Sequence, residues 1–204
     1  MEAAIRDQIA FFQDIGQAFE WKVYDYDRPV DLKQRLSAHG FECEDAESIL
    51  VLDMAEAPDI LLQPPAHDVR RLTDPGQIGQ VVAIKAQVWG QDRTDVGRYL
   101  ADALTSQPQR MSVYVGYVDG QSASAGWIYF PEGSRFASLW GGATLSGFRR
   151  RGLYTALLAA RLQAAMERRV DFLTVDASEM SRPILERHGF IKIAEAVACH
   201  WRPK

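Results

Sequence analysis

The sequence predicts an α+β fold in which a mostly antiparallel sheet carries several helices. Apolar residues recur with a helical period in some segments and with a strand period in others. Asp119-Gly120 stands between two strand-like stretches and is a strong signal for a tight hairpin. With 204 residues and 47% hydrophobic content, the chain is long enough to bury a sizeable core.

The N-terminal part predicts a small helix-strand-helix-strand subdomain over residues 1–60. Its first helix is expected because apolar residues repeat at steps of three and four, at Ile5, Ile9, Phe12, Ile15 and Phe19. The expected elements are a helix over 3–19, a strand over 21–26, a helix over 29–38 and a strand over 48–53. Residues 55–68 contain three prolines, which favours a fairly stiff linker.

Residues 61–204 are interpreted as the second and larger domain. From residue 69 its elements follow the order β-α-α-β-β-β-α-β-α-β. The expected strands are 69–72, 111–118, 123–130, 136–145, 172–175 and 191–199, and the expected helices are 76–89, 96–104, one ending near 169, and 182–188. Gly141-Gly142 inside a strand permits a close approach to the backbone.

Bulk properties exclude several classes of protein. A formal net charge of −4 argues against broad nucleic-acid binding, and no stretch has the roughly 18 apolar residues of a membrane span. Cys43 and Cys199 stand far apart in no metal-binding or redox spacing, so a reduced, cytoplasmic setting is expected and no metal is predicted. The start of the chain carries early acids and does not resemble a signal peptide. We expect a soluble monomer or homodimer.

One stretch concentrates positive charge, Gly147-Phe-Arg-Arg-Arg-Gly-Leu-Tyr-Thr-Ala-Leu-Leu158. Three arginines and a glycine stand directly before strong helix formers. A helix N-terminus has unpaired N–H groups and a partial positive charge, and arginine donors suit phosphate oxygens. The stretch therefore predicts a pyrophosphate site, although a solvated helix start explains the same residues.

Two motifs resemble the GNAT superfamily of N-acetyltransferases. Arg149 and Gly152 match the acyl-CoA-binding motif Gln/Arg-x-x-Gly-x-Gly/Ala, while Tyr154 stands where the family usually has glycine or alanine. The segment Arg182-Pro-Ile-Leu-Glu-Arg-His-Gly-Phe190 resembles a second family motif, in which Gly-Phe turns the chain into the last strand. The element order from residue 69 also agrees with the family.

The resemblance implies acetyl-CoA as cofactor and an amine as acceptor, joined by direct attack of the amine on the thioester. It implies a splayed sheet in which residues 143–145 pair with the pantetheine arm and the N–H groups of residues 150–155 hold the pyrophosphate. The cofactor-binding residues it implies are Ala143, Thr144, Leu145, Arg149, Arg150, Arg151, Gly152, Leu153, Tyr154, Thr155 and Ser178.

The family's usual catalytic residues are missing. Leu185 stands where the family carries its proton-donating tyrosine, and residues 138–144 contain no carboxylate to act as base. Asp176 is our candidate for the base, with a helix cap, a surface acid or ordered water as alternatives. Ser178 can hydrogen-bond the pantetheine arm and is assigned to the catalytic set with Asp176. These departures leave a non-catalytic acyl-CoA-binding or sensor protein as the alternative function.

The remaining signals concern the acceptor and the N-terminal part. Trp89, Trp127 and Trp140 either line an acceptor pocket or belong to the core. The loop acids Asp92, Asp95 and Glu132 either attract a cationic amine or are simply solvated. The residues Arg28-Pro29 and His39-Gly40-Phe41 echo Arg182-Pro183 and His188-Gly189-Phe190, which indicates either chance or a truncated GNAT-like half.

Overall fold

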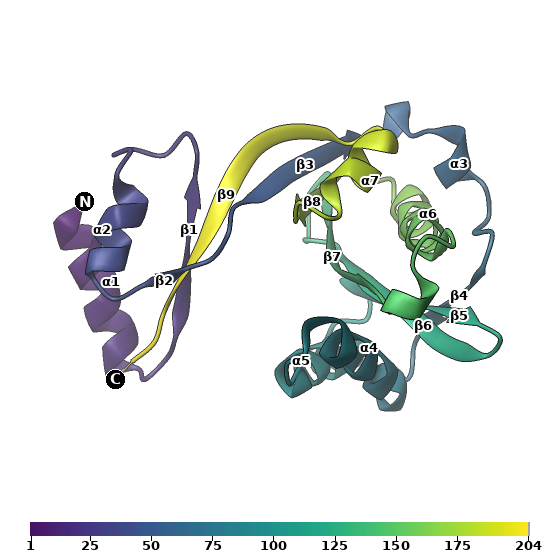
Figure 1. Cartoon of the computed structure of the whole chain (residues 1–204), viewed down its shortest axis with the longest axis horizontal. Helices are drawn as coiled ribbons and strands as arrows, with labels where there is room; N and C mark the ends of the chain where they lie inside the picture. Colours follow the sequence, from purple (N-terminus) through teal and green to yellow (C-terminus); the bar gives the residue numbers. More distant parts are fainter. Residues whose placement is uncertain (204) are drawn as a thin grey trace. The chain divides into compact units, whose positions relative to one another are not determined.

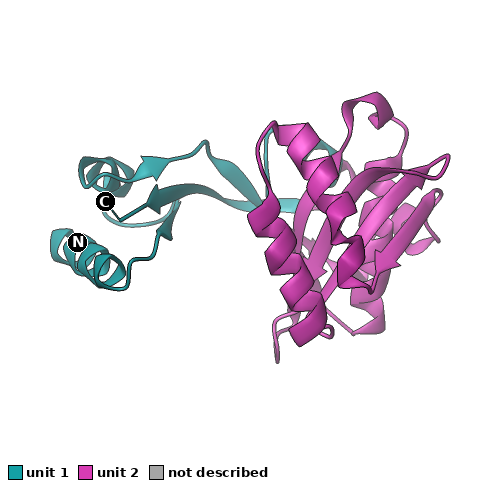
Figure 2. Cartoon of the chain, turned by 90° about the horizontal axis from the view of Figure 1, so that it is seen from below, with its two compact units in different colours: residues 1–50, 176–186, 191–204 teal, residues 51–175, 187–190 magenta. Residues whose placement is uncertain are grey.

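The computed structural model describes residues 1–203 and divides into two compact units (Figure 2). Unit 1 combines residues 1–50 with residues 176–186 and the C-terminal residues from Ile191 on, and unit 2 holds residues 51–175 and 187–190. The units are interleaved along the chain, so a domain boundary at residue 60 stays a prediction.

The N-terminal elements broadly follow the sequence expectation (Figure 1). They are α1 (Glu2–Asp14), β1 (Phe19–Tyr24), α2 (Leu32–Ala38), β2 (Glu42–Cys43), β3 (Glu47–Asp53), the 3-10 turn η1 (Met54–Glu56) and α3 (Asp59–Leu62). The first helix ends earlier than predicted because Gly16 takes a positive φ of 64°, and Ile15 is exposed. The linker prediction is wrong in part, since α3 forms within it and buries Leu61 against α6.

The later elements confirm the predicted order from residue 69. They are β4 (Asp68–Leu72), η2 (Pro75–Ile78), α4 (Gly79–Trp89), α5 (Thr94–Ser106), β5 (Met111–Val118), β6 (Gln121–Tyr129), β7 (Phe136–Thr144), η3 (Ser146–Phe148), α6 (Leu153–Glu167), β8 (Phe172–Ala177), α7 (Arg182–Arg187) and β9 (Ile191–Trp201). The hairpin at Asp119-Gly120 is confirmed, because both residues have the positive φ that such a turn requires.

The sheet is mostly antiparallel, as predicted. Within residues 1–203 it has nine strands in the order β1-β9-β3-β8-β7-β6-β5-β4, with β2 paired to β9. β4 to β7 pair antiparallel in sequence order, while β7 and β8 pair parallel from Phe136↔Phe172 to Leu139↔Val175. In unit 2, α4 and α5 cover one face of the sheet and α6 covers the other (Figure 1).

Unit 1 has its own small core around the C-terminal strand. β1 runs antiparallel to β9, with Phe19 opposite Trp201 and Trp21 opposite Cys199. The buried residues of this core are Ile5, Leu32, Leu36, Phe41, Cys199 and Trp201. The N-terminal helices therefore bury their apolar faces against a strand from the other end of the chain.

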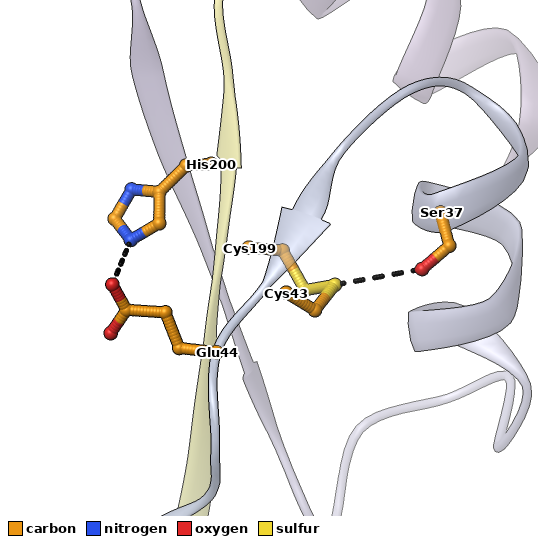
Figure 3. Close-up of a disulfide and its surroundings, with 5 residues drawn as sticks. All are labelled: Ser37, Cys43, Glu44, Cys199 and His200. Atoms are coloured by element: carbon orange, nitrogen blue, oxygen red, sulfur yellow. Dashed lines mark hydrogen bonds and ion pairs between the residues drawn. A yellow bond between two sulfur atoms is a disulfide. The ribbon is translucent and has the colours of Figure 1, made fainter.

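The two cysteines are bonded to each other, so the expectation of free, reduced thiols is wrong. Cys43 of β2 lies directly opposite Cys199 of β9, and their sulfur atoms form a disulfide across a sequence separation of 156 residues (Figure 3). Beside it, His200 bonds Glu44 through Nε2 at 3.1 Å. Spacing along the chain could not reveal this pair, because only the antiparallel register of β2 and β9 brings the two cysteines together.

Candidate active site

The start of α6 presents a row of unpaired backbone donors. Gly152 precedes the helix with φ 82°, a left-handed conformation that favours glycine. Among residues 1–203, no acceptor is bonded to the N–H groups of residues 150–155. Added to the positive end of the helix dipole, these donors can hold a phosphate or pyrophosphate.

The three arginines of the turn are exposed, and no carboxylate within residues 1–203 forms a salt bridge with any of them. Arg149 donates through Nε to the Thr144 carbonyl at 3.1 Å, and this bond holds its side chain beside the end of β7. Arg150 has a positive φ of 60°, and the Arg151 guanidinium lies 5.8 Å from the Phe148 ring centre. Their charges are therefore available to an anion from solvent.

Two histidines lie beside this turn. His67, from the stretch interpreted as a linker, places Nε2 3.1 Å from where a side-chain carbon on Gly152 would be. His188 Nε2 and the Thr155 hydroxyl are 3.1 Å apart, and burial, followed by the charge of Arg187, lowers the pKa of His188. The sequence analysis did not single out His67, because the only local signal was the pair of prolines before it, and these indicated a linker.

β7 has a bulge near its middle. Trp127 of β6 lies opposite Trp140 and Ala125 lies opposite Ala143, so Gly126 faces two residues of β7, Gly141 and Gly142. Such a bulge leaves one residue unpaired in the ladder, and a backbone N–H at such a position can polarise a carbonyl. Gly141 has φ 63°, and a Cβ there would stand 1.9 Å from the Trp127 ring, so only glycine fits.

Residues 143–145 present one edge to β6. Ala143 pairs with Ala125, its carbonyl accepts from the Ser124 hydroxyl at 2.8 Å, and Leu145 N–H donates to the Ala123 carbonyl at 2.9 Å. The pairing of β7 with β8 ends at Leu139↔Val175. The edge of residues 143–145 that faces away from β6 therefore has backbone N–H and carbonyl groups that an extended ligand can bond. A splayed sheet has such an edge.

Asp176 and Ser178 belong to unit 1, whereas the arginine-rich turn belongs to unit 2. Asp176 accepts a hydrogen bond from the Lys22 ammonium of β1 in a half-buried ion pair. Burial alone would lower the pKa of Lys22, but Asp176 raises it above its ordinary value. Burial, followed by the charge of Asp176, raises the pKa of Glu47. The exposed Ser178 hydroxyl lies 3.3 Å from that of Ser181.

Leu185 is fully buried, so it contributes packing and no proton. A tyrosine does stand at the bulge, however. The Tyr154 ring lies 3.1 Å from where a side-chain carbon on Gly142 would be, and its hydroxyl 3.7 Å from the same point. Burial raises the pKa of Tyr154, which keeps the phenol protonated.

The tryptophans lie on the opposite face of the sheet from α6. Trp127 is buried, whereas Trp89 and Trp140 are each almost half exposed. Lys85 of α4 lies between Trp89 and Trp127, and the sequence reasoning overlooked it. The helical spacing Ile78-Val82-Lys85-Trp89 could have revealed it, because it places a lysine within an apolar stripe.

Two of the three acids expected in loops are engaged elsewhere, whereas Asp95 lies in the first turn of α5 and its charge acts on Lys85. Asp92 accepts from the Thr94 N–H at 2.9 Å and from the Thr94 hydroxyl at 2.6 Å, while Glu132 pairs with Arg110.

A shallow cavity of about 370 Å³ lies beside Arg110, Phe130 and Phe136, at the opposite end of β7 from the arginine-rich turn. No helix within residues 1–203 combines the length and apolarity needed to cross a bilayer.

Comparisons with known proteins agree with this fold. One similar solved structure is a GCN5-related N-acetyltransferase from Kribbella flavida, with a TM-score of 0.72 and 17% identity over 100% of this chain and 75% of that one. A second is a tandem GNAT protein from the clavulanic acid biosynthesis pathway, with a TM-score of 0.64 and 15% identity over 97% of this chain and 69% of that one. A third is a GCN5-related N-acetyltransferase from Sphaerobacter thermophilus, with a TM-score of 0.63 and 14% identity over 98% of this chain and 67% of that one. At these identities they establish the fold, over both units of the chain. The comparison with curated proteins gave no match.

The family model described as the acetyltransferase (GNAT) family matches residues 81–190, just over half of the chain. The matched residues include α4 from Val81 on, the bulge of β7, the arginine-rich turn and α7. The chain therefore belongs to the GNAT acetyltransferase family and is an acyltransferase that uses acyl-CoA.

Proposed function

We propose that this protein is an N-acetyltransferase that moves the acetyl group of acetyl-CoA to a primary amine of a small molecule or a protein. The observation that carries the proposal is the start of α6, where unpaired N–H groups and three unpaired arginines adjoin the edge of β7. These donors fit the pyrophosphate of CoA, and the backbone of residues 143–145 fits its pantetheine arm. Ser178 remains the proposed further partner of that arm.

Acetyl-CoA supplies a thioester, and the residues of the chain position and polarise it. A backbone N–H of the bulge at Gly141-Gly142 donates a hydrogen bond to the carbonyl oxygen as that oxygen gains negative charge. The amine nitrogen forms a bond to the carbonyl carbon, the C–S bond breaks, and CoA leaves as a thiolate. The amine loses one proton to Asp176 or to water, and the thiolate gains one.

Tyr154 is our proposed donor of that proton, because its protonated phenol is adjacent to the bulge. We expect Tyr154→Phe to lower kcat by about a hundredfold or more, the usual contribution of a general acid, with little change in the Kd of CoA. Leu185→Tyr is the comparison, and it should not change kcat by more than about tenfold. An unchanged kcat in Tyr154→Phe would leave water as the acid.

The proposed CoA site is tested by calorimetric titration with CoA and acetyl-CoA. Replacing Arg149 and Arg151 together by alanine should weaken binding by about 1.5–3 kcal/mol, or about tenfold to 150-fold in Kd, if charge-assisted bonds are lost. The control Arg6→Ala/Arg202→Ala removes the same charge from exposed positions and should bind like the wild type. An unchanged Kd in the first variant would refute the site.

Transfer itself is tested by following thiol release from acetyl-CoA with a panel of amines. Release that depends on an amine supports the proposal. Firm CoA binding without transfer to any amine would instead indicate a non-catalytic acyl-CoA-binding or sensor protein, as the buried Leu185 allows.

A cytoplasmic location stays a prediction. The formed disulfide does not favour it, because disulfides are more common in oxidising compartments.

A further inference from the structure

Two cations without a carboxylate partner surround Trp89 at the end of α4. Lys85 is only 8% exposed, and its Nζ lies 4.2 Å and 5.0 Å from the ring centres of Trp89 and Trp127. Within the described part of the chain, this ammonium has no hydrogen bond and no ion pair. Arg93 lies 5.8 Å from the Trp89 ring centre, and its Nε is buried without a partner.

This arrangement is costly without an anion. A buried charge is destabilising unless it is paired and hydrogen-bonded, and the faces of the tryptophan rings compensate only part of that cost. Burial, followed by the charge of Arg93, lowers the pKa of Lys85 to about 8, against a smaller opposite effect of Asp95. A carboxylate held by both cations would remove the penalty and form charge-assisted hydrogen bonds.

The same cluster adjoins the place where the acetyl group is transferred. The Trp127 ring occupies the space beside Gly141 of the bulge. Trp140 lies directly opposite Trp127 in the ladder, so both rings are on the face that carries α4. A ligand anchored at Lys85 and Arg93 can therefore extend over exposed tryptophan surface toward the bulge.

We propose that Lys85 and Arg93 bind a carboxylate of the acceptor, so that the acceptor is an amino acid or a similar small molecule that carries both an amine and a carboxylate. The proposal rests on the acetyltransferase function and specifies its substrate class. Trp89 and Trp140 supply apolar surface for the remainder of the acceptor. Of the three acids that could attract a purely cationic amine, Asp92 is engaged with Thr94, Glu132 is engaged with Arg110, and the charge of Asp95 acts on Lys85.

The test compares matched acceptors with acetyl-CoA as donor: phenylalanine, leucine and glutamate against their amides. The wild type should prefer the free acid at least about tenfold in kcat/KM, the gain expected from a charge-assisted pair. Lys85→Met should bring this ratio close to one, and Lys85→Arg should restore much of it. Lys33→Met, at an exposed lysine of α2, is the control and should keep the wild-type preference.

A second measurement does not depend on turnover. Titration of the tryptophan fluorescence with N-acetylphenylalanine should saturate in the wild type and be at least about tenfold weaker in Lys85→Met. Affinity should fall as the pH rises through about 8, since Lys85 loses its proton; the charged groups that face it are Arg93 and Asp95. Melting curves of Lys85→Met should show that it is folded, as expected for an apolar side chain at a buried position.

The outcomes separate the two proposals. Transfer to amines with no preference for the free acid overturns the carboxylate site and leaves the acetyltransferase function in place. Without transfer or CoA binding, the proposed function fails, and the fluorescence titration alone decides the anion site. Binding that depends on Lys85 supports the site, and equal titrations of the wild type and Lys85→Met overturn it.

Discussion

At the scale of single residues, charge partners decide what each side chain can do. The exposed arginines of the turn have no salt bridge within residues 1–203 and are free to bind an anion, whereas Asp176 is held by Lys22. Lys85 is a buried cation that forms no salt bridge within residues 1–203. Residue type alone did not distinguish these cases, because the partners come from strands and helices far apart in the chain.

The pair formed by Lys22 and Asp176 gives a prediction about catalysis. Asp176→Asn should lower kcat more than about tenfold if Asp176 accepts the amine proton, but it also leaves Lys22 half buried without its partner. The double variant Lys22→Met/Asp176→Asn removes both charges and separates these effects. Equal losses of kcat in the two variants, over pH 6–9, support a proton acceptor. Recovery of wild-type kcat in the double variant would show that Asp176 is structural.

At the scale of elements, two glycines determine the geometry of the proposed site. Gly152 lets the chain enter α6 with its N–H groups exposed, and Gly141 allows β7 to bulge against Trp127. Propensity predicted the helix and the strand. The bulge required knowledge of the register, since only the pairs Trp127↔Trp140 and Ala125↔Ala143 reveal the extra residue.

We expect Gly141→Ala to destabilise the protein by about 1–3 kcal/mol beyond the cost of its positive φ, because the new carbon would overlap the Trp127 ring. Gly133→Ala is the matched control, since Gly133 has a similar φ of 68° and no atom within 4 Å of the added carbon. Denaturant unfolding of both variants measures the difference. Equal losses of stability would show that Trp127 moves aside without cost.

At the scale of the whole molecule, the two ends of the chain form one unit. β9 pairs with β1 and β2, so helices from the first 40 residues pack against a strand that ends at Trp201. The GNAT-like echo in the sequence has a structural counterpart: Gly40 and Gly189 have φ of 87° and 86°, each follows a short helix, and each precedes a buried phenylalanine.

The disulfide between Cys43 and Cys199 stabilises this closure. Removing it as Cys43→Ala/Cys199→Ala should lower the free energy of unfolding by about 2–4 kcal/mol, because the unfolded chain is no longer cross-linked. Thermal melts with and without a reductant measure the effect. The reductant should lower the Tm of the wild type only, and an equal shift in the double variant would assign the change to another cause.

The sequence by itself determined the order of elements from residue 69, the hairpin at Asp119-Gly120, the arginine-rich helix start and the family. Each of these depends on neighbours in the chain: hydrophobic period, turn residues and helix capping. The tertiary structure decided the disulfide, the bulge at Gly141-Gly142, the ion pair of Asp176 and the unpaired Lys85. These depend on strand register and burial, which join residues that local propensity treats as independent.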